Sequence, residues 1–144
     1  MRRSDDYGKG LYARTQMFYA AMAYWFHADE ARRAAGEVVA SLTDRMIDLQ
    51  DKYDAFSYLE DTHLFASFGH LAGYSSAYYT YMWSLVIAKD LFTAFDEDLF
   101  APEVARRYRD RVLGPGGSKD AADLVTDFLG RPYTFDAYAA WLAS

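Results

Sequence analysis

Apolar residues recur at the three- to four-residue spacing of a helix through the first third of the chain. Between Gly10 and His27 they cover most of the helical circumference, which predicts a buried helix with apolar positions Leu11, Phe18, Met22, Trp25 and Phe26. Asp29 is then expected to cap a second helix that runs to about Lys52. The apolar stripe of this second helix comprises Val38, Val39, Leu42, Met46 and Leu49.

The rest of the chain continues the helical pattern between recognisable stop signals. After an irregular stretch over residues 53–76, an apolar and aromatic run predicts a helix over Ala77–Phe95. Three further helices are predicted: Pro102–Leu113, one capped by Ser118 that ends at Gly130, and one capped by Thr134 that ends at Leu142. Because no segment alternates with a period of two, we expect an all-α fold, a single domain over residues 1–144 with about six helices.

Composition narrows the class of protein. Hydrophobic residues make up 52% of the 144 residues, which is enough to bury a sizeable core. A net charge of −6 argues against a nucleic-acid partner, because it opposes a phosphate-binding surface. No apolar stretch approaches the ~20 residues needed to cross a bilayer, and no apolar run follows Met1-Arg2-Arg3 as it would in a signal peptide. We therefore expect a soluble cytoplasmic protein with no membrane partner.

The sequence contains no motif for a metal site or a nucleophile. None of its three histidines lies four residues from another, so the helical zinc motif H-E-x-x-H does not occur. The chain has no Cys and no G-x-S-x-G, which removes thiolate ligands and two common nucleophiles. We therefore expect no metal site made by this chain alone.

The stretch Phe68–Trp83 concentrates glycine, histidine and tyrosine. Tyr74, Tyr78 and Tyr81 are spaced by four and three residues, and would place their hydroxyls on one face of a helix that begins near Tyr74, with His70 just before it. A row of phenols with an imidazole suits a peptide carbonyl or a developing oxyanion. The same spacing is also typical of an aromatic core stripe with satisfied hydroxyls, and the spacing alone favours that interpretation.

This stretch resembles the Gly/Tyr loop of the thimet oligopeptidase family of zinc metallopeptidases, which includes oligopeptidase A and peptidyl-dipeptidase. Further matches follow in family order, namely Asp90-Leu91-Phe92, Arg106-Arg107-Tyr108-Arg109, Leu113 to Ser118, and Phe128-Leu129-Gly130-Arg131. The resemblance implies that the chain is the helical C-terminal segment of a zincin-type catalytic domain. One departure is that Gly73 stands alone before Tyr74, where better-known members have two glycines.

The resemblance also implies a function and a set of site residues. The family hydrolyses short peptides with a zinc ion held upstream of this region, so zinc is expected in the complete enzyme and no cofactor in this chain. By position, Tyr81 would donate to the oxyanion and His70 would contact the substrate, the two catalytic residues expected here. Tyr74, Tyr78 and Gly73 would bind the substrate backbone.

Three interpretations stay open from the sequence. The chain is expected to be the C-terminal part of an oligopeptidase that is inactive alone and needs the missing zinc-bearing segment. The alternatives are a non-catalytic helical interaction module, or one chain of a two-chain peptidase. In isolation, the apolar surfaces of the helices predicted over Gly10–His27 and Ala77–Phe95 are expected to drive formation of a homo-oligomer.

Overall fold

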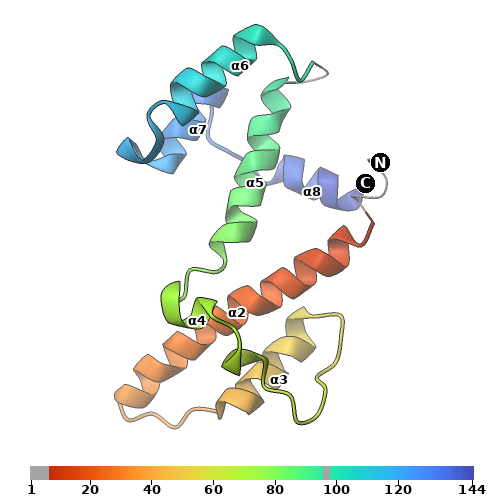
Figure 1. The fold of residues 1–144 in the computed structure, drawn as a ribbon, viewed down its shortest axis with the longest axis vertical. Helices are drawn as coiled ribbons and strands as arrows, with labels where there is room; N and C mark the ends of the chain where they lie inside the picture. The colour runs from red at the N-terminus through yellow and green to blue at the C-terminus, as the bar shows by residue number, and fades with distance from the viewer. Residues whose placement is uncertain (1–6, 96–97) are drawn as a thin grey trace. The chain divides into compact units, whose positions relative to one another are not determined.

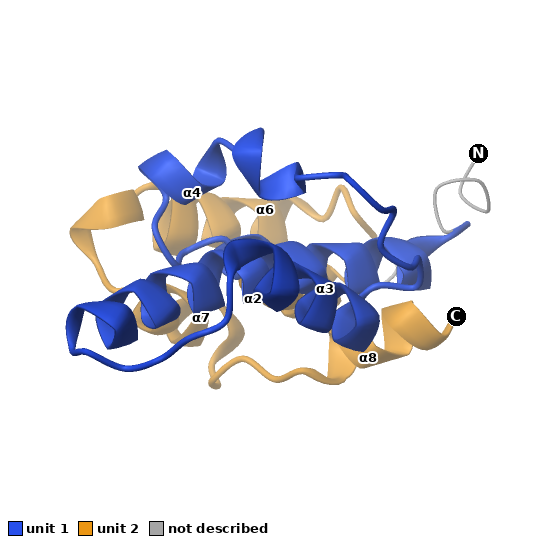
Figure 2. Ribbon diagram, turned by 90° about the horizontal axis from the view of Figure 1, so that it is seen from below, with its two compact units in different colours: residues 1–82 blue, residues 83–144 orange. Residues whose placement is uncertain are grey.

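Every regular element in the described part of the chain is helical. The computed structural model describes residues 7–95 and 98–144, and no β-strand occurs within those ranges. The prediction of an all-α fold is therefore confirmed (Figure 1). The chain divides into two compact units, residues 1–82 and 83–144 (Figure 2), and each is described by itself. A single domain over residues 1–144 stays a prediction.

The first unit begins with one long helix, α2 (Lys9–Ala34), which continues through the predicted break between His27 and Asp29. The second predicted helix, from Asp29 to about Lys52, is wrong over residues 35–41, which are not helical and precede a helix that begins at Leu42. The predicted helix start at Asp29 is wrong, because the Asp29 carboxylate is buried and does not cap a helix. It accepts hydrogen bonds from Arg45 Nε at 2.6 Å and from Arg32 Nη1 at 3.3 Å. The hydrogen bond from Arg45 is the main reason why the pKa of the Asp29 carboxyl lies below its ordinary value.

A glycine lies two residues beyond the C-terminal end of α2. Gly36 has a φ of 85°, in the left-handed region that glycine adopts without a steric penalty. The backbone N–H of Glu37 donates to the Arg32 carbonyl, and that of Gly36 donates to the Arg33 carbonyl, both at 3.0 Å. These two bonds satisfy carbonyls that the end of the helix leaves without intrahelical donors.

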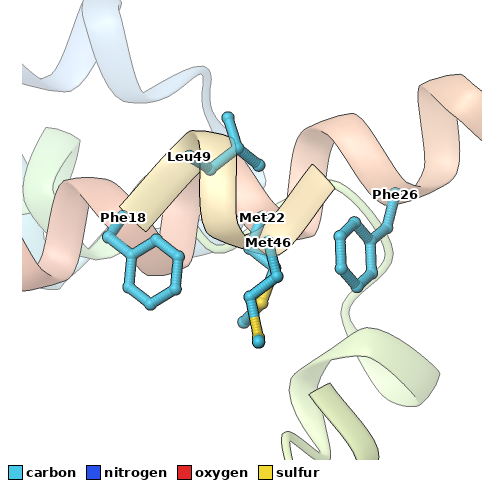
Figure 3. Close-up of a cluster of buried hydrophobic side chains, with 5 residues drawn as sticks. All are labelled: Phe18, Met22, Phe26, Met46 and Leu49. Carbon is cyan, nitrogen blue, oxygen red and sulfur yellow. The ribbon is translucent and has the colours of Figure 1, made fainter. Parts of the chain in front are cut away.

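Helix α3 (Leu42–Tyr53) packs against α2 and completes the core of the first unit. Its N-cap is Ser41, whose Oγ accepts a hydrogen bond from the backbone N–H of Asp44 at 3.1 Å. Figure 3 shows the buried side chains that form this core, which are Phe18, Met22 and Phe26 of α2 and Met46 and Leu49 of α3. Full burial stabilises each such side chain by about 1.5–3 kcal/mol.

Short helical turns connect this core to the next long helix. The elements are η1 (Leu64–Ala66), α4 (His70–Gly73), α5 (Thr80–Phe92) and η2 (Thr93–Phe95). The helix predicted from Ala77 therefore begins three residues later, although η2 extends the helical path to the predicted end at Phe95. A turn precedes the helix, because the backbone N–H of Thr80 donates to the Ala77 carbonyl at 3.1 Å, and Ser76 before this turn has a left-handed φ of 61°.

The second unit begins at Trp83, so it contains most of α5, all of η2 and the elements that follow. These later elements are α6 (Pro102–Tyr108), the π-helical turn η3 (Arg109–Leu113), η4 (Gly116–Ser118), α7 (Ala121–Leu129) and α8 (Asp136–Ala143). The predicted helix start at Pro102 is confirmed, and so is the stop at Gly130, which has a φ of 74°. The predicted cap at Ser118 is wrong, because Asp120 accepts the hydrogen bond from the Ala122 N–H instead. Within the described ranges, no helix combines the length and hydropathy needed to cross a membrane.

A buried ion pair fixes the segment that leads into α8. Asp90 is 1% exposed, and its two carboxylate oxygens each accept a hydrogen bond of 2.7 Å from the guanidinium of Arg131. The backbone N–H of Thr134 donates to the same carboxylate at 2.8 Å, so the predicted role of Thr134 as a helix cap is wrong. The Arg131 hydrogen bonds are the main cause that lowers the pKa of the Asp90 carboxyl.

We predict that Arg131→Ala lowers the free energy of unfolding by about 2–4 kcal/mol, because it leaves a buried carboxylate with one backbone donor. Urea unfolding followed by far-ultraviolet circular dichroism measures the loss. Because the pKa of Asp90 is lowered in the folded wild type, its contribution to wild-type stability should be full above about pH 4 and be lost as the pH falls further.

The matched control is Arg109→Ala, which removes an exposed ion pair with Asp110 in the same unit. This variant should unfold at the same urea concentration as the wild type, since exposed pairs contribute little. Equal midpoints for Arg131→Ala and Arg109→Ala would contradict the prediction.

Candidate functional site

His70 lies at the centre of a group of aromatic rings. Its imidazole contacts the rings of Tyr78, Tyr74 and Tyr81 at centroid distances of 4.9, 5.7 and 5.8 Å. Phe68 adds a fourth ring at 5.2 Å. We refer to these five residues as the His70 cluster. All five belong to the first unit, so the structure brings together every aromatic residue predicted for the site within one compact unit.

The cluster forms through a turn and not through the predicted helix face. The expectation of a helix that begins near Tyr74 is wrong, because Tyr74 and Tyr78 lie in turns and only Tyr81 lies in α5. The left-handed backbone at Ser76 changes the direction of the chain between α4 and α5. The first turn of α5 consequently places Tyr81 beside His70, at the start of α4.

His70 and Tyr81 form a hydrogen-bonded pair that is open to solvent. The Tyr81 hydroxyl lies 3.2 Å from His70 Nε2. Tyr81 is 53% exposed and His70 is half-buried. Two proton arrangements fit this geometry, since either the phenol donates to Nε2 or an Nε2–H donates to the phenol oxygen. In the second arrangement the phenol O–H stays free to donate to a bound molecule.

Tyr78 occupies a different environment from the other tyrosines of the cluster. It is 8% exposed, and its hydroxyl donates to Gln16 Oε1 of α2 at 2.9 Å. Burial is the main cause that raises the pKa of the Tyr78 phenol. The sequence gives no sign of this role of Gln16, because 62 residues separate it from Tyr78 and no local pattern marks the contact.

Tyr74 and Gly73 lie at the open side of the cluster. Tyr74 is 64% exposed, and its ring contacts His70. A Cβ atom added to Gly73 would meet no described atom within 4 Å, and Gly73 does not have a positive φ. Nothing in the described residues therefore requires glycine at this position, and its backbone is accessible to a molecule from outside.

One face of α2 packs against the His70 cluster. Two small side chains on it, Ala20 and Ala23, are 6% and 0% exposed and pack against Tyr78. The Tyr19 ring lies 5.4 Å from that of Phe68 and 5.9 Å from that of Tyr78, edge-on to the latter. The small residues allow the turn to approach the helix closely, and the aromatic contacts hold it there.

The amino-acid sequence matches peptidase family M3 over residues 1–143. The chain therefore belongs to peptidase family M3, which confirms the resemblance found in the tyrosine-rich stretch.

Two relatives illustrate the match. The chain is 28% identical to mitochondrial intermediate peptidase of Mus musculus over 130 residues, which cover 90% of this chain and 17% of that protein. It is 38% identical to oligopeptidase A of Escherichia coli (strain K12) over 77 residues, which cover 53% of this chain and 11% of that protein. The chain thus spans less than a fifth of the length of either relative.

The described residues do not supply a ligand set for the zinc on which this family depends. In residues 7–95 and 98–144, no group of three or more His, Cys, Asp or Glu side chains could hold a metal ion. Both ring nitrogens of His27 face backbone carbonyls, and His70 Nε2 faces Tyr81. These residues therefore do not fit a zinc centre formed by this part of the chain alone.

We predict that Tyr78→Phe lowers the free energy of unfolding by about 1 kcal/mol at neutral pH, because it removes the hydrogen bond to Gln16 and keeps the ring. The raised pKa means that the folded state resists ionisation of Tyr78, so its stabilising effect holds below about pH 10 and is lost at higher pH. Between about pH 8 and pH 11 the wild type should therefore lose more stability than the variant.

Urea unfolding at about pH 8 and at about pH 11 tests both the loss of the hydrogen bond and the alkaline loss of stability. Tyr74→Phe is the matched control, because Tyr74 contacts the same imidazole but is exposed. It should change neither the stability at neutral pH nor the alkaline loss. The prediction fails if Tyr78→Phe and Tyr74→Phe behave alike.

Proposed function

We propose that this chain is the C-terminal part of a zinc-dependent oligopeptidase that cleaves short peptides, and that it supplies substrate-binding and oxyanion-stabilising groups. The observation that carries the proposal is the solvent-facing pair of Tyr81 and His70 in a chain of peptidase family M3. The zinc ligands would come from a segment outside this chain, since the described residues offer none.

In the proposed reaction Tyr81 stabilises the oxyanion that develops on the scissile carbonyl oxygen. When His70 holds a proton on Nε2, it donates to the Tyr81 oxygen and leaves the phenol O–H free to donate outward. Donation from the imidazole polarises the phenol and strengthens its own hydrogen bond to the substrate. A donor aimed where charge develops acts mainly in the transition state, which is the proposed role of Tyr81.

Tyr74 and Gly73 are proposed to bind the substrate backbone. The exposed Tyr74 phenol offers both a donor and an acceptor to a peptide group. The open space at Gly73 lets an extended peptide approach the backbone of the chain. A molecule bound at both residues would lie next to the ring of His70, which contacts Tyr74.

Tyr78 is proposed to bind substrate only after an exchange of hydrogen bonds. Its hydroxyl is buried and already donates to Gln16, so direct contact with a peptide requires that bond to break. Without the exchange, Tyr78 contributes by packing its ring against His70 and Tyr81, each at 4.9 Å.

The proposed partner of the chain is the missing zinc-bearing segment. Aromatic and aliphatic side chains remain exposed on α2, including Leu11, Tyr12, Met17 and Tyr24. Such surface is typical of an interface that is buried in a larger assembly. In the isolated chain, the same side chains are proposed to drive self-association, which light scattering at micromolar concentration would reveal.

We predict that Tyr81→Phe, in a zinc-bearing peptidase that contains this chain, lowers kcat by on the order of 100-fold and changes KM little. Loss of one oxyanion donor costs about 3 kcal/mol in transition-state stabilisation, and the phenyl ring preserves the packing on His70. Steady-state hydrolysis of a fluorogenic peptide measures both constants.

Tyr79→Phe is the control, because Tyr79 is a neighbouring exposed tyrosine outside the His70 cluster. It should retain the wild-type kcat. If Tyr81→Phe also retains it, the proposed oxyanion role of Tyr81 is wrong.

We predict that the isolated chain binds no stoichiometric zinc and does not hydrolyse peptides. A tight zinc site needs at least three protein ligands in one place, which the described residues do not provide. Elemental analysis after dialysis against zinc, together with a fluorogenic-peptide assay, tests this. One tightly held zinc ion per chain accompanied by turnover would overturn the assignment of the metal to another segment.

A further inference from the structure

The side chain of His27, near the C-terminal end of α2, lies between two backbone carbonyls. Its Nδ1 is 2.7 Å from the carbonyl oxygen of Ala23, one turn earlier in α2. Its Nε2 is 3.1 Å from the carbonyl oxygen of Leu71, which is 44 residues away in α4. His27 therefore connects the long helix to the short helix that begins with His70.

Helix α4 depends on contacts from outside itself. It has only four residues, and the carbonyls in the last turn of a helix have no intrahelical donors. The side chain of Leu71 packs against buried groups of the first unit, and His27 offers a donor to its carbonyl. These two contacts fix the residue that directly follows His70.

Each contact of the His27 ring is a hydrogen bond only if the nitrogen that makes it carries a hydrogen, because both partners are acceptors. Carbonyl oxygens only accept, so a contact to Leu71 requires a hydrogen on Nε2 of His27. The imidazolium donates to both carbonyls at once. The neutral ring with its hydrogen on Nε2 keeps the Leu71 bond and gives up the bond to Ala23, whereas the ring with its hydrogen on Nδ1 keeps the Ala23 bond and loses the one to Leu71.

We propose that His27 is a positioning residue for the candidate site: it donates from Nε2 to the Leu71 carbonyl and so sets where α4 presents His70 to Tyr81. His27 itself does not contact the exposed pair, and it acts through the backbone of α4. The consequence for peptide hydrolysis rests on the proposed function, but the effect on the position of His70 does not.

Two amides distinguish the nitrogens of His27. Gln places its side-chain NH2 near the position of Nε2, and Asn places its NH2 near the position of Nδ1. His27→Gln should therefore keep the donor to Leu71, and His27→Asn should lose it. His63→Asn is the control, since His63 is an exposed histidine whose ring contacts Phe65 and lies outside α4.

Nuclear magnetic resonance of the full chain reads out the position of His70. Four aromatic rings surround its imidazole, so ring currents should displace its Hδ2 and Hε1 resonances from those of an unstructured histidine. We expect His27→Gln and His63→Asn to keep this displacement and His27→Asn to lose more than half of it, with unchanged helical circular dichroism. Retention of the full displacement in His27→Asn would overturn the proposal.

If His27→Asn does not fold, a measurement on the unsubstituted chain tests whether His27 Nε2 donates to the Leu71 carbonyl. Two-bond proton–nitrogen correlation spectra identify which ring nitrogens of a histidine carry hydrogen. A protonated Nε2 on His27 is expected, and an unprotonated Nε2 in the folded chain would overturn the proposal. Neither experiment uses peptidase activity, so both remain decisive if Tyr81→Phe shows the proposed function to be wrong.

In the zinc-bearing peptidase, kinetics provide a further readout. His27→Asn should lower kcat about tenfold or more through misplacement of His70, and His27→Gln should restore most of it. If the Gln and Asn variants have equal kcat values while Tyr81→Phe is impaired, the positioning role is wrong and the proposed function stands.

Discussion

The contact between one face of α2 and the turn that carries His70 is the constraint on which the candidate site depends. Gln16, Tyr19, Ala23 and His27 follow one another at intervals of three, four and four residues, so they lie along the same side of the helix. Gln16 accepts a hydrogen bond from the Tyr78 hydroxyl, and the Tyr19 ring contacts the rings of Phe68 and Tyr78. The imidazole of His27 lies at hydrogen-bond distance from the Leu71 carbonyl in α4.

The sequence carries the local helical signals and lacks most of the long-range ones. Pro102 and Gly130 mark helix ends through backbone restrictions that act within a few residues, and both predictions are confirmed. Asp29 has the residue type of a helix cap, but its burial and its bond to Arg45, 16 residues away, determine its actual role. The hydrogen bond between Tyr78 and Gln16 joins residues 62 positions apart, so no repeating pattern in the sequence predicts it.

For the candidate site too, the sequence indicates which residues are involved but not the environment that long-range contacts give to each. Family resemblance selected His70 and the three tyrosines, and the structure brings their rings together. The family resemblance could not show that Tyr81 is exposed and Tyr78 buried, because that difference arises from packing against α2 and not from the spacing of the tyrosines. The chemical roles proposed for the two phenols differ for this reason, with one available to a ligand and the other committed to the protein.

The left-handed backbone at Ser76 has a consequence for how this site could evolve. A side chain in that conformation raises the energy of the folded chain by about 1 kcal/mol, and glycine would relieve it. Glycine would also give the connection between α4 and α5 more conformations, and the separation of His70 from Tyr81 would become less well defined. Selection for thermal stability would therefore favour glycine at this position, and selection for a well-defined separation of the candidate pair would favour a residue with a side chain.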